Sequence, residues 1–282
     1  MRRRIGWGHI LCYLILSTVV IIMLFPLLHI FAIAVSDTSA VMLGNVYFLP
    51  HGFSLEAFRR VLSDSRWQAS FLFTLFCSVV GMCVSLFVMT GSAYALSRNR
   101  CPFRKTILIL IAVTLFFSAR IVPNYLMIKQ LGLLDTTWAV ILPGALSAWP
   151  FFILRSVFLS LPQELEDAGR IDGFNDIGIF LHLALPSSVP VVATIGFLAF
   201  ISYWNLFTQP LLYLDHSFYL SLNCWNPMPH SEEIIDIPYS YLAEDSFKCA
   251  VYLLMTLPPL LLFLPFHRYF SRAIVPAEVI KY

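Results

Sequence analysis

Long apolar runs separated by short polar stretches dominate the chain from end to end. They cover approximately residues 10–35, 69–97, 106–122, 138–159, 187–214 and 247–266. A helix of about 20 apolar residues crosses a bilayer core about 30 Å thick. The pattern predicts an all-α, polytopic membrane protein whose single membrane-spanning domain, residues 1–282, contains six transmembrane helices.

The first apolar run follows three arginines, Arg2 to Arg4, as the core of a signal peptide would. The apolar core of a signal peptide is only about 7–15 residues long, however. The run over residues 10–35 is longer than that and is expected to be an uncleaved first span.

Composition supports a membrane protein, and the distribution of charge indicates which side of the membrane each end of the chain faces. Of the 282 residues, 59% are hydrophobic and 12% are charged, whereas soluble domains average about 45–50% apolar and about 25% charged residues. Arg98, Arg100, Arg104 and Lys105 follow the second run, while residues 215–246 carry six acids and no Lys or Arg. Because Lys and Arg concentrate on the cytoplasmic side of membrane proteins, both termini are expected to be cytoplasmic.

The polar stretch over residues 160–186 has the signals of two short helices. Ser160 and Gln163 have the spacing of a capping box, and acidic residues crowd the following turn, where the helix dipole favours them. Gly173 is expected to end the first helix in a left-handed conformation. Asn175 is a suitable N-cap for a second helix, predicted to end before the next proline.

The residues of this stretch resemble the cytoplasmic coupling loop of ATP-binding-cassette (ABC) importer permeases. That family has the signature E-A-A-x-x-D-G, followed by L-P-x-x-x-P. This chain has Asp167-Ala168-Gly169-Arg170-Ile171-Asp172-Gly173, then Leu185-Pro186 and Pro190. It departs from the signature at Asp167, where the family has Glu, and at Gly169, where the family has Ala. The resemblance implies the type I ABC importer permease fold, with residues 160–186 as the coupling loop. It assigns ATPase coupling to Glu166, Asp167, Ala168, Gly169, Asp172, Gly173 and Pro186.

Two further segments resemble the carbohydrate-importer branch of this family: LGLLDTTWAVILPG over residues 131–144, and the pair Trp204-Asn205. This resemblance implies a permease in the plasma membrane of a bacterium that imports a carbohydrate, an oligosaccharide above all. An extracellular solute-binding lipoprotein would deliver the sugar. The expected partners are a second, homologous permease and two ABC ATPases, with no nucleic acid. The sugar specificity is expected to lie mainly in the binding protein and the second permease.

The chain is expected to be a transport subunit without catalytic residues. It has no G-x-x-x-x-G-K-[ST] phosphate-binding sequence, so ATP and Mg²⁺ are expected on the ATPase subunits and no cofactor on this chain. Its six cysteines lack metal-ligand spacing; Cys224 and Cys249 could face an oxidising exterior, which leaves a disulfide open.

Trp204 and Asn205 are candidates for the substrate path, because an aromatic face and an amide suit a sugar's C–H surface and hydroxyls. The alternative is that Trp204 packs in the protein and Asn205 bonds a neighbouring helix. Arg120, near the outer end of the third span, either extends to the lipid headgroups or contacts an acidic sugar.

Other functions are less well supported by the residues. A permease of the same fold for a non-sugar solute is the main alternative. A channel would need a charged ring or a carbonyl filter, and a membrane enzyme would need clustered His, Asp or Glu at depth. The apolar runs contain neither pattern.

Overall fold

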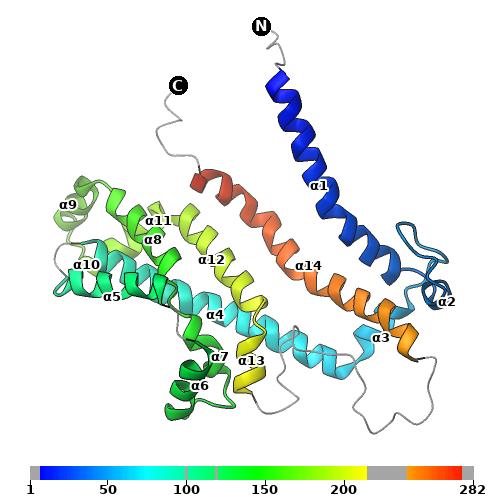
Figure 1. Ribbon diagram of the computed structural model, residues 1–282. Helices are drawn as coiled ribbons and strands as arrows, with labels where there is room; N and C mark the ends of the chain where they lie inside the picture. The colour runs from blue at the N-terminus through cyan, green and yellow to red at the C-terminus, as the bar shows by residue number, and fades with distance from the viewer. Residues whose placement is uncertain (1–6, 99–100, 118–119, 215–239, 275–282) are drawn as a thin grey trace. The chain divides into compact units, whose positions relative to one another are not determined.

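The computed structural model describes residues 7–98, 101–117, 120–214 and 240–274, and these residues form helices joined by short connections (Figure 1). Within these ranges the only β-structure is an isolated bridge between Ser36 and Phe53. The prediction of an all-α protein is confirmed. The helices are α1 Trp7–Ala34, α2 Thr38–Met42, α3 Glu56–Ser63, α4 Ser65–Ser97, α5 Arg104–Phe116, α6 Ile121–Gln130, α7 Thr137–Ile141, the 3₁₀ turn η1 Leu142–Gly144, α8 Ala148–Ser160, α9 Gln163–Ile171, α10 Asp176–Ile179, the π-helix η2 Phe180–Ala184, α11 Leu185–Ser187, α12 Val189–Trp204, α13 Thr208–Tyr213 and α14 Ser240–Ile274.

The chain divides into two compact units, of which the first comprises residues 1–68 and 226–258. Its long apolar helix α1 is followed by a connection that folds back on the helix end. Phe25 packs edge-on against Phe48, with ring centroids 4.8 Å apart, and His29 forms a hydrogen bond to the Tyr47 carbonyl.

The second unit comprises residues 69–225 and 259–282 and contains both regions of functional interest. Its core lies where α4, α8 and α12 meet the helices of the 160–186 stretch. The buried residues of this core are Met89, Ala93, Tyr94, Leu96, Phe151, Leu154, Phe158, Ile179, Ala184 and Ile195.

Three of the described helices are long and apolar enough to cross a membrane: residues 11–34, 65–97 and 245–270. Two bent pairs bring the total to as many as five. The predicted third span differs most from expectation. α5 has 13 residues, which at about 1.5 Å per residue is about 20 Å, shorter than a bilayer core. Residues 118–119, in the same predicted span, lie outside the described residues, so the count of six remains a prediction.

The two bent pairs place breaks in the fourth and fifth predicted spans. Thr137–Gly144 meets Ala148–Ser160 at 51°, and Asp176–Ser187 meets Val189–Trp204 at 83°. Helices α8 and α12 contact each other between the breaks (Figure 1). One end of this helix pair adjoins the coupling loop, residues 160–186, and the other adjoins α7 and α13.

Candidate functional site

The coupling loop turns on Gly173, as predicted. Its φ angle is +85°, in the left-handed region that favours glycine. The predicted capping box, however, is wrong. Pro162 is the N-cap of α9 and no side chain caps this helix, while the Ser160 hydroxyl donates to the Val157 carbonyl at 2.8 Å. The Ser160 side chain therefore forms its hydrogen bond within α8, whereas the sequence pattern predicted a bond to the start of α9.

The second helix of the loop begins as predicted but continues further. The Asn175 side chain accepts a hydrogen bond from the Gly178 amide at 2.7 Å, which confirms the cap. The predicted end before Pro186 is wrong, because the chain stays helical through η2 and α11 to Ser187. Pro186 lies in the first turn of α11, where its missing N–H is tolerated.

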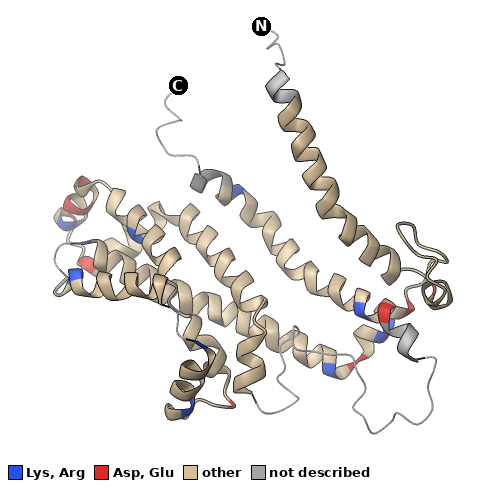
Figure 2. Cartoon of the chain, viewed as in Figure 1, with Lys and Arg blue, Asp and Glu red and all other residues tan. Residues whose placement is uncertain are grey.

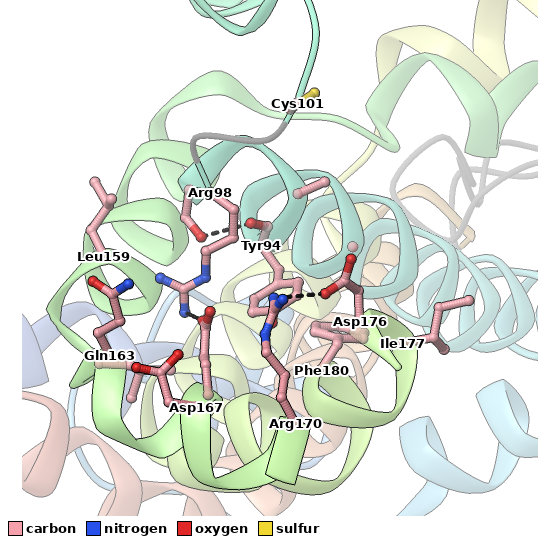
Figure 3. Close-up of a pocket in the computed structure, with 15 residues that line it drawn as sticks. Tyr94, Arg98, Cys101, Leu159, Gln163, Asp167, Arg170, Asp176, Ile177 and Phe180 are labelled. Atoms are coloured by element: carbon pink, nitrogen blue, oxygen red, sulfur yellow. Dashed lines mark hydrogen bonds and ion pairs between the residues drawn. The ribbon is translucent and has the colours of Figure 1, made fainter. Parts of the chain in front are cut away.

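An ion pair links the coupling loop to the end of α4. Arg98 Nη2 contacts Glu166 Oε1, and both side chains are largely shielded, with 23% and 13% of their surface exposed (Figure 3). The Arg98 guanidinium also lies 5.1 Å from the centroid of the Tyr94 ring. Tyr94 in turn packs against Phe158 of α8 and Phe180 of η2. One cation is thus shared by an aromatic ring of the core and an acid of the coupling loop.

A hollow of about 830 Å³ lies beside this ion pair (Figure 3). Arg170 Nη2 donates to Asp176 Oδ1 at 2.9 Å across the Gly173 corner, and Asp167 also lines the hollow. The residues that line it are Gly91, Tyr94, Ala95, Ser97, Arg98, Cys101, Leu159, Leu161, Gln163, Glu166, Asp167, Arg170, Asp176, Ile177 and Phe180.

Basic side chains satisfy the carboxyl end of α4. The Leu96 carbonyl accepts hydrogen bonds from Arg104 Nε at 2.9 Å and from Arg155 Nε at 3.2 Å. A helix C-terminus carries partial negative charge and leaves carbonyls unpaired, so cations are favourable there. Arg155 therefore links α8 to the carboxyl end of α4.

Close packing around position 169 of α9 explains why glycine fits there. An added Cβ would lie 2.7 Å from Leu183 Cδ1 and 3.3 Å from Ile179 Cγ1. The departure from the Ala of the family signature thus accompanies a close approach of α9 to η2.

The loop presents apolar side chains outward as well as charges. Ile171 is 86% exposed and Ile177 67% exposed, and both flank the Gly173 corner. Of the other predicted coupling residues, Asp167, Ala168, Asp172, Gly173 and Pro186 are exposed. Charged residues gather at α9 and the neighbouring helix ends, whereas α12 carries none (Figure 2).

The three predicted substrate-path residues differ in their surroundings, and none of them lines the hollow beside the coupling loop. Trp204 is 2% exposed, stacks on Phe200 and meets Phe71 edge-on. Asn205 is the exposed C-cap of α12, and Arg120 is the exposed N-cap of α6.

The neighbouring Tyr203 lines a second, smaller cavity of about 230 Å³ at the far end of α8 and α12. Its hydroxyl donates to the Ile141 carbonyl at 2.8 Å and lies 3.2 Å from Ser85 Oγ. Its ring fits a slot between Gly81 and Gly144, where added Cβ atoms would lie 2.8 and 2.9 Å from Tyr203. The slot joins α4, the α7–α8 break and α12.

Sequence reasoning missed Arg98, Tyr94 and Tyr203 as members of these sites. Arg98 was noted only as one of several basic residues after the second span. Tyr203 is adjacent to a recognised pair, but the glycines that hold it lie about 60 and 120 positions away in the sequence. No local pattern connects residues so far apart.

The chain matches a protein family described as binding-protein-dependent transport system inner membrane component, over residues 70–276. It is 37% identical to the polygalacturonan/rhamnogalacturonan transport system permease protein YtcP of Bacillus subtilis (strain 168), over 73% of this chain and 72% of that protein. It is 25% identical to the lactose transport system permease protein LacG of Rhizobium radiobacter, over 98% of this chain and 97% of that protein.

Solved structures agree with these relatives. A chain of a bacterial ABC transporter involved in the import of the acidic polysaccharide alginate superimposes with a TM-score of 0.83 at 26% identity. The match covers 96% of this chain and 99% of the transporter chain.

Proposed function

The chain belongs to the family of binding-protein-dependent transport system inner membrane components, and from this premise we propose that residues 160–186 dock an ATPase subunit. The protein is the permease of a carbohydrate ABC importer. It is a transport subunit and a multi-pass membrane protein. Its family works with ATPase and solute-binding partners.

The observation that carries the docking proposal is the pair of exposed isoleucines at a rigid corner. Ile171 and Ile177 flank Gly173, whose fixed conformation, together with the Asn175 cap, holds two helices at a defined angle. Exposed apolar side chains with a charged rim are typical of a protein-binding surface. A helix pair that seats in a groove of a partner fits this arrangement.

We propose further that the ATPase side is the cytoplasm and that both termini lie there. The basic residues that follow α4 support this orientation. The assembly would contain a second, homologous permease, two ATPases that bind ATP and Mg²⁺, and a sugar-delivering lipoprotein. Contact of Trp204, Asn205 or Arg120 with the sugar stays a prediction, and the burial of Trp204 favours its packing alternative.

The route from the coupling loop to the membrane interior is short. Helix α8 has 13 residues and α12 has 16, which gives lengths of about 20 and 24 Å. Each begins or ends at the coupling loop and reaches the smaller cavity without another break. Movement of the docked loop would therefore reach the cavity through two stiff helices in contact.

The docking proposal is tested with Ile171→Glu in the complete importer. We expect the ATPase subunit to be lost on co-purification while the permease stays in the membrane. Leu43→Glu is the matched control: Leu43 is 74% exposed at the end of α2, outside the coupling loop. The proposal is wrong if Ile171→Glu retains the ATPase as well as Leu43→Glu does.

A further inference from the structure

The smaller cavity lies where helical structure is interrupted, between α7 and α8 and between α12 and α13. Its walls come from α4, α6, the α7–α8 break, α12 and α13, which are all in the second unit. Irregular backbone within a bilayer is tolerated only where it is buried in protein or lines a polar cavity. Interrupted hydrophobic segments in transporters mark candidate binding sites for this reason.

Three side chains that line the cavity have unused hydrogen-bonding groups. Ser147 is the N-cap of α8 but forms no capping bond. The Gln209 amide and the Tyr213 hydroxyl likewise have no hydrogen-bond partner among the described residues. Tyr213 as a residue is 4% exposed, but its hydroxyl is not among the buried polar atoms without a partner, so it remains accessible to a polar ligand in the cavity that it lines. These groups therefore favour a polar ligand.

The lining is polar but uncharged. Among the described residues that line it, none is Lys, Arg, His, Asp or Glu, and its polar members include Ser85, Ser147, Tyr203, Gln209 and Tyr213. Hydroxyls and amides both donate and accept, which matches sugar hydroxyls. An ionised carboxylate would find no basic side chain here, and a charge without a charged partner in such a site is costly.

The volume limits how much of a carbohydrate can enter. Sites for drug-sized ligands occupy about 300–1,000 Å³, whereas this cavity has about 230 Å³. That size suits one sugar ring rather than an oligosaccharide. The stacked rings of Tyr125 and Tyr213, with centroids 6.4 Å apart, supply an aromatic surface beside it.

We propose that this cavity is a contact site for one neutral sugar ring of the transported carbohydrate, held by Ser147, Gln209 and Tyr213. The proposal rests on the carbohydrate-permease function and adds a location and a charge class to it. Uronic acid rings are excluded from this site, although two of the related transporters described above act on acidic polysaccharides.

The first test measures occupancy at position 147. A Ser147→Cys variant of the complete importer in lipid nanodiscs is modified with a maleimide, and modification is quantified by mass spectrometry, with Cys101 as the internal reference. The probes are glucose, galactose, mannose and xylose on one side and glucuronate and galacturonate on the other. At least one neutral sugar is expected to slow modification at position 147 about two- to fivefold and leave Cys101 unchanged, while neither uronate protects. Absence of protection by all four neutral sugars, or equal protection by a uronate, overturns the proposal.

The second test distinguishes a wrong assignment of the sugar site from a wrong assignment of the carbohydrate-import function. Proteoliposomes that contain the importer and its binding protein are assayed for carbohydrate uptake. Gln209→Ala is expected to reduce the uptake rate about three- to tenfold, the effect of one lost hydrogen bond, and Gln130→Ala, an exposed glutamine of α6 outside the cavity, is the matched control. If the wild type imports a carbohydrate but Gln209→Ala equals Gln130→Ala, the site assignment fails alone. If the wild type imports no carbohydrate, the function fails as well.

Discussion

The two ends of the α8–α12 pair meet opposite physical demands. At the coupling end, Arg98, Glu166, Arg170 and Asp176 form charged contacts around a hollow of about 830 Å³. At the other end, hydroxyls and the amides of Asn124 and Gln209 surround about 230 Å³ with no ionised group among the described lining residues. Charge is inexpensive beside water and costly within a bilayer, so the two sites use different chemistry for the same purpose, the fixing of helix positions.

The coupling end and the cavity end of the α8–α12 pair are also held in place by different contacts. The coupling end is held by the Gly173 conformation, by the Arg170–Asp176 ion pair within the loop and by the Arg98–Glu166 ion pair between the loop and the end of α4. The cavity end is held by one ring, Tyr203, that fills a slot between Gly81 and Gly144. Damage to the first should separate the ATPase from the permease, and damage to the second should loosen the permease itself.

The largest effect is expected for Gly173→Val. Valine at φ +85° is strained by about 1–3 kcal/mol, and relief of that strain would change the angle between the two coupling helices. We expect loss of uptake and of ATPase co-purification, with the permease still in the membrane.

Gly132→Val is the control for Gly173→Val. Gly132 also has a positive φ, +67°, and an added Cβ at either position meets no atom within 4 Å. Both variants therefore place valine at a left-handed backbone position with no steric clash, at different locations in the fold. Equal loss of the ATPase in both variants would show that general misfolding, and not the coupling corner, is responsible.

Tyr203→Ala should give the next largest effect, and it should appear in stability. Removal of a buried aromatic side chain costs about 3–5 kcal/mol, and Tyr203 is 5% exposed. We expect a marked fall in the thermal unfolding midpoint of the detergent-solubilised permease.

Conservative variants sharpen this prediction. Tyr203→Phe keeps the ring but loses the hydrogen bonds to Ile141 and Ser85, which should cost about 1 kcal/mol. Tyr213→Phe removes a hydroxyl that has no hydrogen-bond partner in the described chain and should cost less. A reversed order would contradict the role of Tyr203 as the central contact of the cavity end.

A smaller effect is expected from the Arg98–Glu166 ion pair. Because both side chains are mostly shielded, Glu166→Gln should cost about 1–2 kcal/mol in the stability of the coupling loop. Asp176→Asn removes the partner of Arg170 at a more exposed site, where the two side chains are 34% and 68% accessible, and should cost less than 1 kcal/mol.

Charge reversal tests whether the Arg98–Glu166 contact itself matters. Arg98→Glu combined with Glu166→Arg should recover ATPase stimulation that either single reversal loses. If the double variant performs no better than the single ones, the contact is incidental.

At the coupling end the sequence predicted the Gly173 corner and the Asn175 cap but not the capping box, the end of the second helix or the role of Arg98, and at the cavity end it did not predict Tyr203. The Gly173 corner and the Asn175 cap depend on residues within a few positions of each other, so their spacing carries the signal. The capping box failed because Ser160 has an alternative partner one turn back in α8. Tyr203 could not be predicted, since its slot is built from α4 and the α7–α8 break, which only tertiary packing brings together.

The smallest expected effect concerns Gly169, where the family signature has alanine. In an isolated helix, Ala would be favoured over Gly by about 1 kcal/mol. Here the new Cβ would lie 2.7 Å from Leu183 Cδ1, so we expect Gly169→Ala to lower the unfolding midpoint slightly instead of raising it. Leu183→Ala removes the obstructing atom, and in that background Gly169→Ala should become stabilising. A double-mutant cycle on the purified permease measures the difference, which should exceed about 0.5 kcal/mol for residues in contact. Additive effects would mean that α9 can move away from η2 at little cost, and the coupling end would then be less rigid than its contacts indicate.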